Sequence, residues 1–286
     1  MENKTIYALG YFDGVHLGHK ALLDACRDAA KDCQSGAVTF LGHPQKLLSG
    51  NAVRLINTDD DRRFLLRNYV DTVEEFPFTE KLMIMPWQDF LDLLVSKYNA
   101  AGFVCGSDFR FGSRGEGTAE LLEQYCKERN LSCCVVQQQI LDGIRISSTH
   151  IRTLLEQGDI MQANRFLGHA HILSGTVQSG KQLGRTIGFP TANFLYPEEL
   201  LQLPLGVYAC QAQVDGKLYN AITNIGTRPT VSGEGVWVES HLLNFSGDLY
   251  GKNLTLAFLK FIRPEQKFST LADLQKQIAR DMQYFS

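Results

Sequence analysis

The sequence predicts two domains of different fold class: an α/β domain built on a parallel sheet, followed by a small antiparallel β-barrel with a C-terminal helix. The chain has 286 residues, which is long for a single hydrophobic core. Its first half alternates strand-like and helix-like patterns, whereas its second half contains closely spaced strand-like runs separated by turns. With 44% hydrophobic and 21% charged residues, the composition is that of a globular protein with substantial buried cores.

The first half opens with an apolar run at Thr5–Leu9, which predicts a strand. Residues 19–33 carry apolar side chains at helical spacing, and residues 37–40 predict a second strand. Helical patterns then cover 59–68, 86–97 and 118–129, and strand-like runs cover 103–105 and 131–136. Strands separated by helices indicate βαβ units, so we expect a Rossmann-like parallel sheet. Its ligands should bind beyond the carboxyl ends of the strands, where residues 11–19 and 106–112 would lie.

Residues 147–167 are helical in pattern, with a break at Gly158-Asp159, and we expect linker helices there. The domains are therefore predicted at residues 1–167 and 168–286. Strand-like runs follow at 171–177, 206–214, 218–225, 236–245 and 254–261 without helices between them, which predicts an antiparallel barrel. A final helix at about 271–284 should pack across this barrel.

Charge and cysteine usage exclude several classes of function. The net charge is −3 and neither half has a basic surplus, so we expect no nucleic-acid partner. The seven cysteines form no CxxC pair, which favours reduced thiols over disulfides or zinc. The N-terminus does not resemble a signal peptide and no apolar run is long enough to span a membrane. We expect a cytoplasmic protein without membrane contact. These properties are compatible with a homo-oligomer.

The turn after the first strand contains the first candidate site, Gly14-Val15-His16-Leu17-Gly18-His19. A helix N-terminus offers free N–H groups and partial positive charge to a phosphate, and Gly14 and Gly18 let the backbone approach it. His16 and His19 can donate hydrogen bonds to a phosphate whose charge grows during transfer. Alternatively, both are ordinary turn or capping residues; the strand–turn–helix context favours the catalytic interpretation. Zinc is disfavoured, because no third ligand is evident nearby.

A second anion-binding feature closes the first half. Residues 146–152 begin a helix with three hydroxyl side chains and an arginine, namely Ser147, Ser148, Thr149 and Arg152. These groups would bind the other phosphates of a nucleotide. The alternative is a plain N-cap by Ser147 or Ser148, which uses the same free N–H groups.

The loop at residues 106–112 follows a predicted strand and carries two aromatic residues around an arginine. Its residues Asp108, Phe109, Arg110 and Phe111 could bind a planar ring by stacking, with Asp108 bonded to a polar edge of the ring. A turn whose aromatic side chains are tucked into the core explains the same residues equally well.

The second half contains a different candidate site, near a glycine-rich turn at residues 188–193. Backbone N–H groups of this loop could surround phosphates, with glycines at Gly180, Gly184 and Gly188. Thr191 and Asn193 supply neutral oxygens suited to magnesium, and Glu239 on a predicted strand is a candidate general base. Residue types alone favour the alternative, in which Thr191 and Asn193 form a turn and Glu239 is a solvated strand residue.

These motifs together resemble those of the bacterial bifunctional riboflavin kinase/FMN adenylyltransferases, also called FAD synthetases. Segments 14–19, 108–112 and 146–152 are similar to the adenylyltransferase motifs, and segments 188–193 and 238–242 to the kinase motifs, all in the usual order. The resemblance implies that riboflavin is phosphorylated to FMN by ATP, and that FMN is then adenylylated by a second ATP to FAD, with release of pyrophosphate. It also implies Mg²⁺ as the cofactor, held by Thr191 and Asn193, and catalysis by Glu239.

The chain departs from the usual family pattern at three places. Gly42-His43-Pro44 stands where the family usually has Pro-His-Pro, and His169-Ala170-His171 where Arg-Pro-Tyr is common. Asn244 replaces a common aspartate. None of these removes a residue assigned to chemistry. Two other hypotheses stay open: an enzyme that retains only one activity, and a non-catalytic flavin- or nucleotide-binding regulator. Retention of both histidines and Glu239 favours the bifunctional enzyme.

Overall fold

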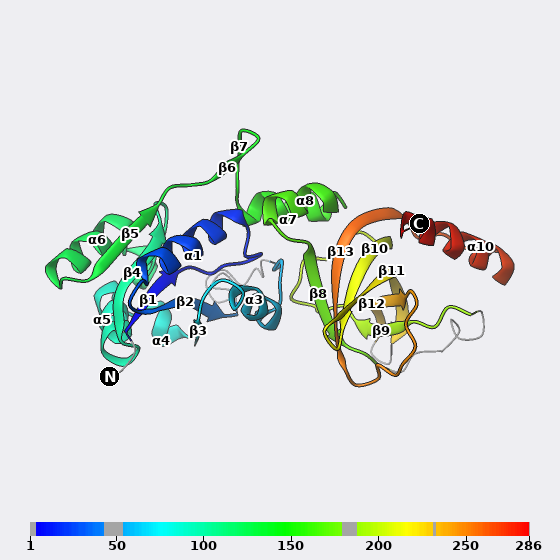
Figure 1. Ribbon diagram of the computed structural model, residues 1–286, viewed down its shortest axis with the longest axis horizontal. Helices are drawn as coiled ribbons and strands as arrows, with labels where there is room; N and C mark the ends of the chain where they lie inside the picture. The colour runs from blue at the N-terminus through cyan, green and yellow to red at the C-terminus, as the bar shows by residue number, and fades with distance from the viewer. Residues whose placement is uncertain (1–3, 43–53, 179–187, 231–232, 286) are drawn as a thin grey trace. The chain divides into compact units, whose positions relative to one another are not determined.

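The computed structural model describes residues 4–42, 54–178, 188–230 and 233–285, which form two compact units (Figure 1). The first unit comprises residues up to 55 together with 59–148, and the second comprises 56–58 and the residues from 149 onward. Each unit has one main sheet, with five strands in the first and six in the second. The predicted order of fold classes, a parallel sheet followed by an antiparallel sheet with a C-terminal helix, is confirmed. The expected domain boundary at residue 167 stays a prediction.

The first unit contains a parallel sheet with the strand order β3-β2-β1-β4-β5. Its strands are β1 (Thr5–Leu9), β2 (Gln34–Leu41), β3 (Thr72–Pro77), β4 (Ala100–Gly106) and β5 (Ser132–Val136). The helices are α1 (Leu17–Ala29), α3 (Asp59–Leu66), α4 (Glu80–Met83), α5 (Trp87–Lys97) and α6 (Ala119–Glu128), and a short hairpin joins β6 (Ile140–Leu141) to β7 (Ile144–Arg145). All five residues of β1 are buried, as expected for the centre of a parallel sheet covered on both faces.

The strand order reverses between β1 and β4, because the chain adds β2 and β3 on one side of β1 and then crosses to the other. Such a reversal opens a crevice at the carboxyl ends of the two strands, where ligands of doubly wound sheets bind. The turn that carries His16 follows β1, and the loop that carries Asp108 follows β4. The fold therefore brings these two predicted segments to the same edge.

The sequence analysis did not identify β3, α4 or the β6–β7 hairpin. β3 is an edge strand whose residues are only half-buried, and its two glutamates break the apolar run that would have revealed it. α4 has four residues, too few for a helical period to show in the sequence. These are marginal elements that packing, rather than local pattern, holds in place.

The second unit is an antiparallel sheet with the strand order β8-β13-β10-β11-β12-β9. Its strands are β8 (His171–Thr176), β9 (Ala192–Leu195), β10 (Gly206–Val214), β11 (Lys217–Thr230), β12 (Gly233–Leu242) and β13 (Asn253–Pro264). The two edge strands are joined where Gln178, just after β8, donates its backbone N–H to the carbonyl of Asn193 at 2.7 Å. The sheet thus curls towards a barrel, as predicted.

Asn193 lies in a strand, whereas the sequence predicts a turn at residues 188–193. Ala192 and Asn193 belong to β9, and Asn193 pairs with Glu239 of β12. The strand is short and follows Pro190, so its sequence resembles a loop; pairing with β12 is what makes it extended. This pairing brings two predicted site residues into register.

Helices α7 (Ser148–Glu156) and α8 (Ile160–Leu167) belong almost entirely to the second unit, which therefore continues from residue 149 onward. Asn164 of α8 donates its Nδ2 to the carbonyl of Phe258 and accepts the backbone N–H of His171, both at 2.8 Å. One amide side chain therefore joins the helix to β13 and β8. The last helix, α10 (Leu271–Met282), is anchored by Asp281, which accepts hydrogen bonds from Arg263 of β13.

Replacing His171 by tyrosine should make the second unit less sensitive to acid. His171 is 3% exposed, and its Nδ1 has no partner among the residues that the structure describes. Burial, assisted by the nearby His169, lowers the pKa of His171 to about 3. The unfolded chain takes up this proton near the ordinary pKa of about 6.5, so the folded state is favoured fully above that pH and progressively less as the pH falls towards 3.

The expected loss in unfolding free energy is about 1.4 kcal/mol at pH ~5.5. Urea unfolding of the wild type and His171→Tyr, followed by circular dichroism between neutral pH and pH ~5, measures it. The variant should lose less stability than the wild type over this interval. Equal losses in the two proteins would contradict the lowered pKa of His171.

Candidate active sites

The first unit contains a cavity of about 220 Å³ at the carboxyl edge of its sheet. Segments after β1, β4 and β5 line it, as does the start of α7. The predicted residues that line it are His16, Gly18, His19, Asp108, Phe109, Ser147 and Ser148. Segments more than a hundred residues apart in the sequence therefore meet at one cavity.

The turn between β1 and α1 has a strained backbone that points its side chains into this cavity. Phe12 and Val15 adopt positive φ angles of 59° and 42°, and Gly14 adopts 84°. Left-handed backbone is unfavourable for a β-branched residue such as Val15, and strain of this kind persists where the surrounding structure enforces it. A Cβ on Gly18 would lie 3.1 Å from the His16 ring, so this position has room only for glycine unless the ring moves.

His16 and His19 form a stacked pair, with ring centroids 3.6 Å apart and an interplanar angle of 10°. His16 caps α1, because its Nδ1 accepts the backbone N–H of His19 at 3.2 Å. An accepting Nδ1 leaves the ring proton of a neutral His16 on Nε2, which makes that atom a donor. The capping alternative is thus correct for Nδ1 of His16.

His19 is neutral near pH 7. Burial, with the neighbouring charges of His16 and Arg62, lowers the pKa of His19 well below its ordinary value. Its Nδ1 is buried and has no hydrogen-bond partner within the described ranges. Buried polar atoms without partners are rare, and at a cavity they commonly indicate a group that a ligand satisfies.

The four residues predicted at the start of α7 are divided between the two units. Ser148 donates its Oγ to the carbonyl of Asp13 at 2.8 Å, which ties the start of α7 to the β1–α1 turn. Ser147 lines the cavity with it. Thr149 and Arg152 belong to the second unit and do not line the cavity.

In the loop after β4, one aromatic side chain lies in the core and the other lies beside a cavity. Phe111 is 6% exposed and belongs to the core, whereas Phe109 is half-buried and stacks on it at 5.4 Å. Asp108 forms an ion pair with Arg145. Phe109, Arg110 and Phe111 also line a second, largely apolar cavity of about 600 Å³. The sequence analysis missed its other aromatic walls, which include Tyr11, Phe40 and Phe78.

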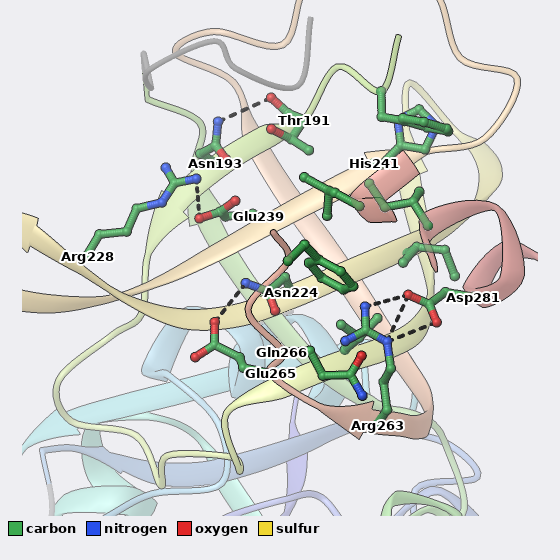
Figure 2. A pocket seen from close by; sticks show the side chains of 16 residues that line it. Thr191, Asn193, Asn224, Arg228, Glu239, His241, Arg263, Glu265, Gln266 and Asp281 are labelled. Atoms are coloured by element: carbon green, nitrogen blue, oxygen red, sulfur yellow. Dashed lines mark hydrogen bonds and ion pairs between the residues drawn. The ribbon is translucent and has the colours of Figure 1, made fainter. Parts of the chain in front are cut away.

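The second unit contains a cavity of about 330 Å³ between the outer face of its sheet and α10 (Figure 2). Thr191, Asn193 and Glu239 line it, as predicted. Apolar side chains from the sheet and from α10 form part of its wall, including Val207, Ile222, Leu274 and Ile278. Further polar side chains also line it, among them Arg263 and Asp281.

Glu239 is not a solvated strand residue. Its side chain is 17% exposed and forms an ion pair with Arg228 of β11 (Figure 2). Burial raises the pKa of Glu239, the charge of Arg228 opposes this, and the charge of Glu265 adds to it. A partly buried carboxylate with a raised pKa is suited to accept a proton.

Asn193 and Thr191 fit a small hard cation. Asn193 is 5% exposed; its Nδ2 donates to the carbonyl of Thr191 at 3.2 Å, and its buried Oδ1 has no partner among the described residues. An amide oxygen and a hydroxyl are ligands that Mg²⁺ accepts. Across the described ranges, no group of three or more His, Cys, Asp or Glu side chains could hold a metal ion. Gly188 has φ of 83° and open space around it, and Gly180 and Gly184 lie outside the described residues.

Thr191 also lines a second cavity of the same unit, of about 320 Å³. Ser240, Ser246 and Asp248 contribute polar groups to its wall. No pattern in the sequence indicated this cavity. Two cavities thus meet at one threonine, beside Asn193 and Glu239.

The comparisons with known proteins give one consistent result over both units. The family described as FAD synthetase matches residues 1–150, and the riboflavin kinase family matches residues 167–286. A bifunctional riboflavin kinase/FMN adenylyltransferase of Escherichia coli K12 is 37% identical, over 96% of this chain and 90% of that protein. One of Bacillus subtilis is 33% identical, over 99% of this chain and 93% of that protein.

A crystal structure of a macrolide-efflux protein from Streptococcus pneumoniae is 29% identical, covers 99% of this chain and 94% of that chain, and has a TM-score of 0.85. In the part of the chain that the structure describes, no helix has the length and apolar character needed to cross a membrane. The matched families cover both units, and the curated relatives match almost end to end. The chain belongs to the family of bifunctional riboflavin kinase/FMN adenylyltransferases.

Proposed function

We propose that the second unit phosphorylates riboflavin to FMN and that the first unit adenylylates FMN to FAD, each with its own ATP. The observation that carries this proposal is that each unit has its own reactive residues beside its own pair of cavities. A regulator that only binds flavin has no need of a partly buried general base or of a stacked pair of histidines. Family membership and site chemistry therefore support the same pair of activities.

In the kinase reaction, Glu239 accepts the proton of the 5′-hydroxyl of riboflavin as that oxygen attacks the γ-phosphorus of ATP. The bond between the γ-phosphorus and the bridging oxygen breaks, and ADP leaves. Arg228 orients the carboxylate through their ion pair. The largely apolar cavity suits the flavin, and the more polar cavity beside it suits ATP, with the phosphates at Thr191 where the two meet.

Thr191 and Asn193 would hold Mg²⁺ at this junction. The ion would supply positive charge that offsets the charge of the transferred phosphoryl group. The buried Oδ1 of Asn193 and the neutral character of both ligands support this assignment. Gly188 would let the backbone approach the phosphates; the expectation for Gly180 and Gly184 concerns residues outside those that the structure describes.

In the adenylyl transfer, a phosphate oxygen of FMN attacks the α-phosphorus of ATP, and the bond to the β-phosphate breaks to release pyrophosphate. This oxygen is already ionised near neutral pH, so the step needs no general base. His16 and His19, as hydrogen-bond donors, stabilise the charge that develops on the α-phosphate. Ser147 and Ser148 bind the leaving pyrophosphate, and Gly14 and Gly18 allow the close backbone approach.

The flavin of FMN binds in the apolar cavity next to the histidine site. Phe109 and Phe111 supply stacked aromatic surface, and Arg110 lines the same cavity. Asp108 lines the adjoining one, where it can bond to a polar edge of the substrate. The free cysteines and the absence of a membrane-spanning helix among the described residues fit an enzyme of the cytoplasm.

Replacing Asn193 by alanine should raise the magnesium concentration needed for half-maximal riboflavin kinase activity by at least about tenfold. The FMN adenylylation rate should keep its wild-type magnesium dependence, because Asn193 belongs to the other unit. Magnesium titrations of both activities measure this. Thr191→Val and Thr191→Ser form a matched pair: only the serine keeps the hydroxyl, so only the valine should share the defect. An unchanged kinase titration in Asn193→Ala would contradict the site.

One assay tests the proposed function as a whole. The purified chain is incubated with riboflavin, ATP and magnesium, and FMN and FAD are separated by chromatography. Both products should appear, with FMN forming first. If only FMN forms, the chain retains the kinase activity alone. If riboflavin is not converted but supplied FMN becomes FAD, it retains the adenylyltransferase activity alone. Tight flavin binding without turnover would favour a regulator.

A further inference from the structure

Arg62 of α3 is an unusual residue, because it is fully buried and incompletely paired. Its exposed fraction is 0%. Only Nη2 is bonded, to the carbonyl of Phe40 at 2.6 Å and to Asp59 Oδ1 at 2.8 Å. Nε and Nη1 are also buried and have no partner among the described residues. Burying a charge with two unsatisfied donors is unfavourable, so this arrangement is retained for a reason other than stability.

The flat face of the Arg62 guanidinium lies against Tyr11, whose ring centroid is 4.6 Å from the guanidinium carbon. Burial raises the pKa of the Tyr11 hydroxyl, and the charge of Arg62 partly offsets that rise. From the backbone side, Thr39 donates its Oγ1 to the carbonyl of Tyr11 at 2.9 Å. Tyr11 is therefore fixed at its backbone by β2 and at its ring by α3.

Tyr11 lies where the two cavities of the first unit adjoin. It lines both the histidine cavity and the apolar cavity, and the other residue common to the two walls is Phe109. Arg62 lines neither cavity. Apart from the effect of its charge on His19, the arginine therefore reaches the cavity walls through Tyr11.

We propose that Arg62 is a positioning residue for adenylyl transfer: it holds the ring of Tyr11 as the wall between the nucleotide and flavin cavities, and so aligns the FMN phosphate with the α-phosphate of ATP. This inference rests on the proposed function. In-line transfer depends on the alignment of the attacking oxygen, and a misplacement of about 1 Å can lower a rate on the order of 100-fold. A guanidinium is suited to this task, because it stacks flat on a ring while its fork bonds to a carbonyl and a carboxylate.

The test is a double-mutant cycle on FAD formation from supplied FMN, with the variants Arg62→Met, Tyr11→Leu and the double variant. Arg62→Met keeps the apolar length of the side chain but removes the fork and the charge, and Tyr11→Leu removes the ring. Arg63→Met is the matched control, because Arg63 is the next residue of α3 and pairs with Asp60 and Glu75 instead. Riboflavin kinase activity of the same samples and thermal unfolding check that the chain is intact.

We expect each single variant to lower kcat for FAD formation on the order of 100-fold at saturating substrates. Adding Arg62→Met to Tyr11→Leu should lower kcat little further, since the arginine acts through the ring. Arg63→Met should stay within about twofold of the wild type. Additive losses would overturn the proposal, because they would mean that Arg62 acts independently of Tyr11. An unchanged kcat in Arg62→Met would overturn it as well.

If Arg62→Met does not fold, Arg62→Lys takes its place in the cycle. Lysine keeps the charge but not the planar fork, so a wild-type kcat in Arg62→Lys would overturn the proposal. The wild type, assayed alongside, separates the two levels of inference. No FAD from the wild type would refute the proposed function and this inference with it, whereas equal kcat values in the wild type and the arginine variant would refute this inference alone.

Discussion

Replacing Glu239 by glutamine should abolish phosphorylation of riboflavin while supplied FMN is still converted to FAD at the wild-type rate. Glutamine has the shape of glutamate and can still contact Arg228, but it cannot accept the proton of the attacking hydroxyl. Loss of a general base lowers a rate by about 10²- to 10⁴-fold. Separate assays of the two steps, one started with riboflavin and one with FMN, measure the effect.

Glu265→Gln is the matched control for Glu239→Gln. Glu265 lines the same cavity and accepts a hydrogen bond from Asn224 at 3.3 Å (Figure 2). The Glu265→Gln variant should keep far more of the kinase rate than Glu239→Gln, because Glu239 pairs in register with Asn193, the proposed magnesium ligand. A kinase rate that survives in Glu239→Gln would show that another group is the base. Equal loss of both activities would count against separate sites.

Replacing His19 by alanine should have the opposite effect: FMN accumulates and little FAD forms. The substitution removes a neutral donor from the adenylyl-transfer site and the ring on which His16 stacks. Loss of one donor to a developing oxyanion lowers kcat by about 10²- to 10³-fold. Riboflavin kinase activity should be unchanged, because His19 lies in the other unit.

His169→Ala serves as the control for this variant, since it removes a half-buried histidine from the second unit. Its rate of FAD formation from FMN should match the wild type. Thermal unfolding checks that the first unit of His19→Ala remains folded. Normal FAD formation by a folded His19→Ala protein would refute the assignment of the histidine site.

The fold class could be predicted because its signals are local. Apolar runs and helical periods revealed β1, α5 and α6, and motif order supported the two site regions. The elements that were missed depend on distant partners: β9 is extended because it pairs with β12, and β3 is held at the edge of the sheet by β2. No window of sequence contains such information.

The same limit applies to the sites. Motifs were enough to propose the two histidines, Ser148, Asn193 and Glu239 as site residues. The structure places these side chains at cavities, and their catalytic roles stay predictions. Arg62, Tyr11 and Arg228 escaped notice, because their meaning lies in what they touch across the sheet. A buried arginine in a charged helix such as α3 looks like a surface residue until the packing is known.

The hydrogen bond from Gln178 to Asn193 has a consequence for folding as well as for catalysis. It closes the seam between the first and last strands of the curled sheet, and the same asparagine presents its side chain to the ligand. A ligand that binds Asn193 only in the folded unit therefore stabilises that unit against unfolding, by about 1.4 kcal/mol for each tenfold excess of the ligand over its Kd. We accordingly expect ATP and magnesium to raise the unfolding temperature of the second unit.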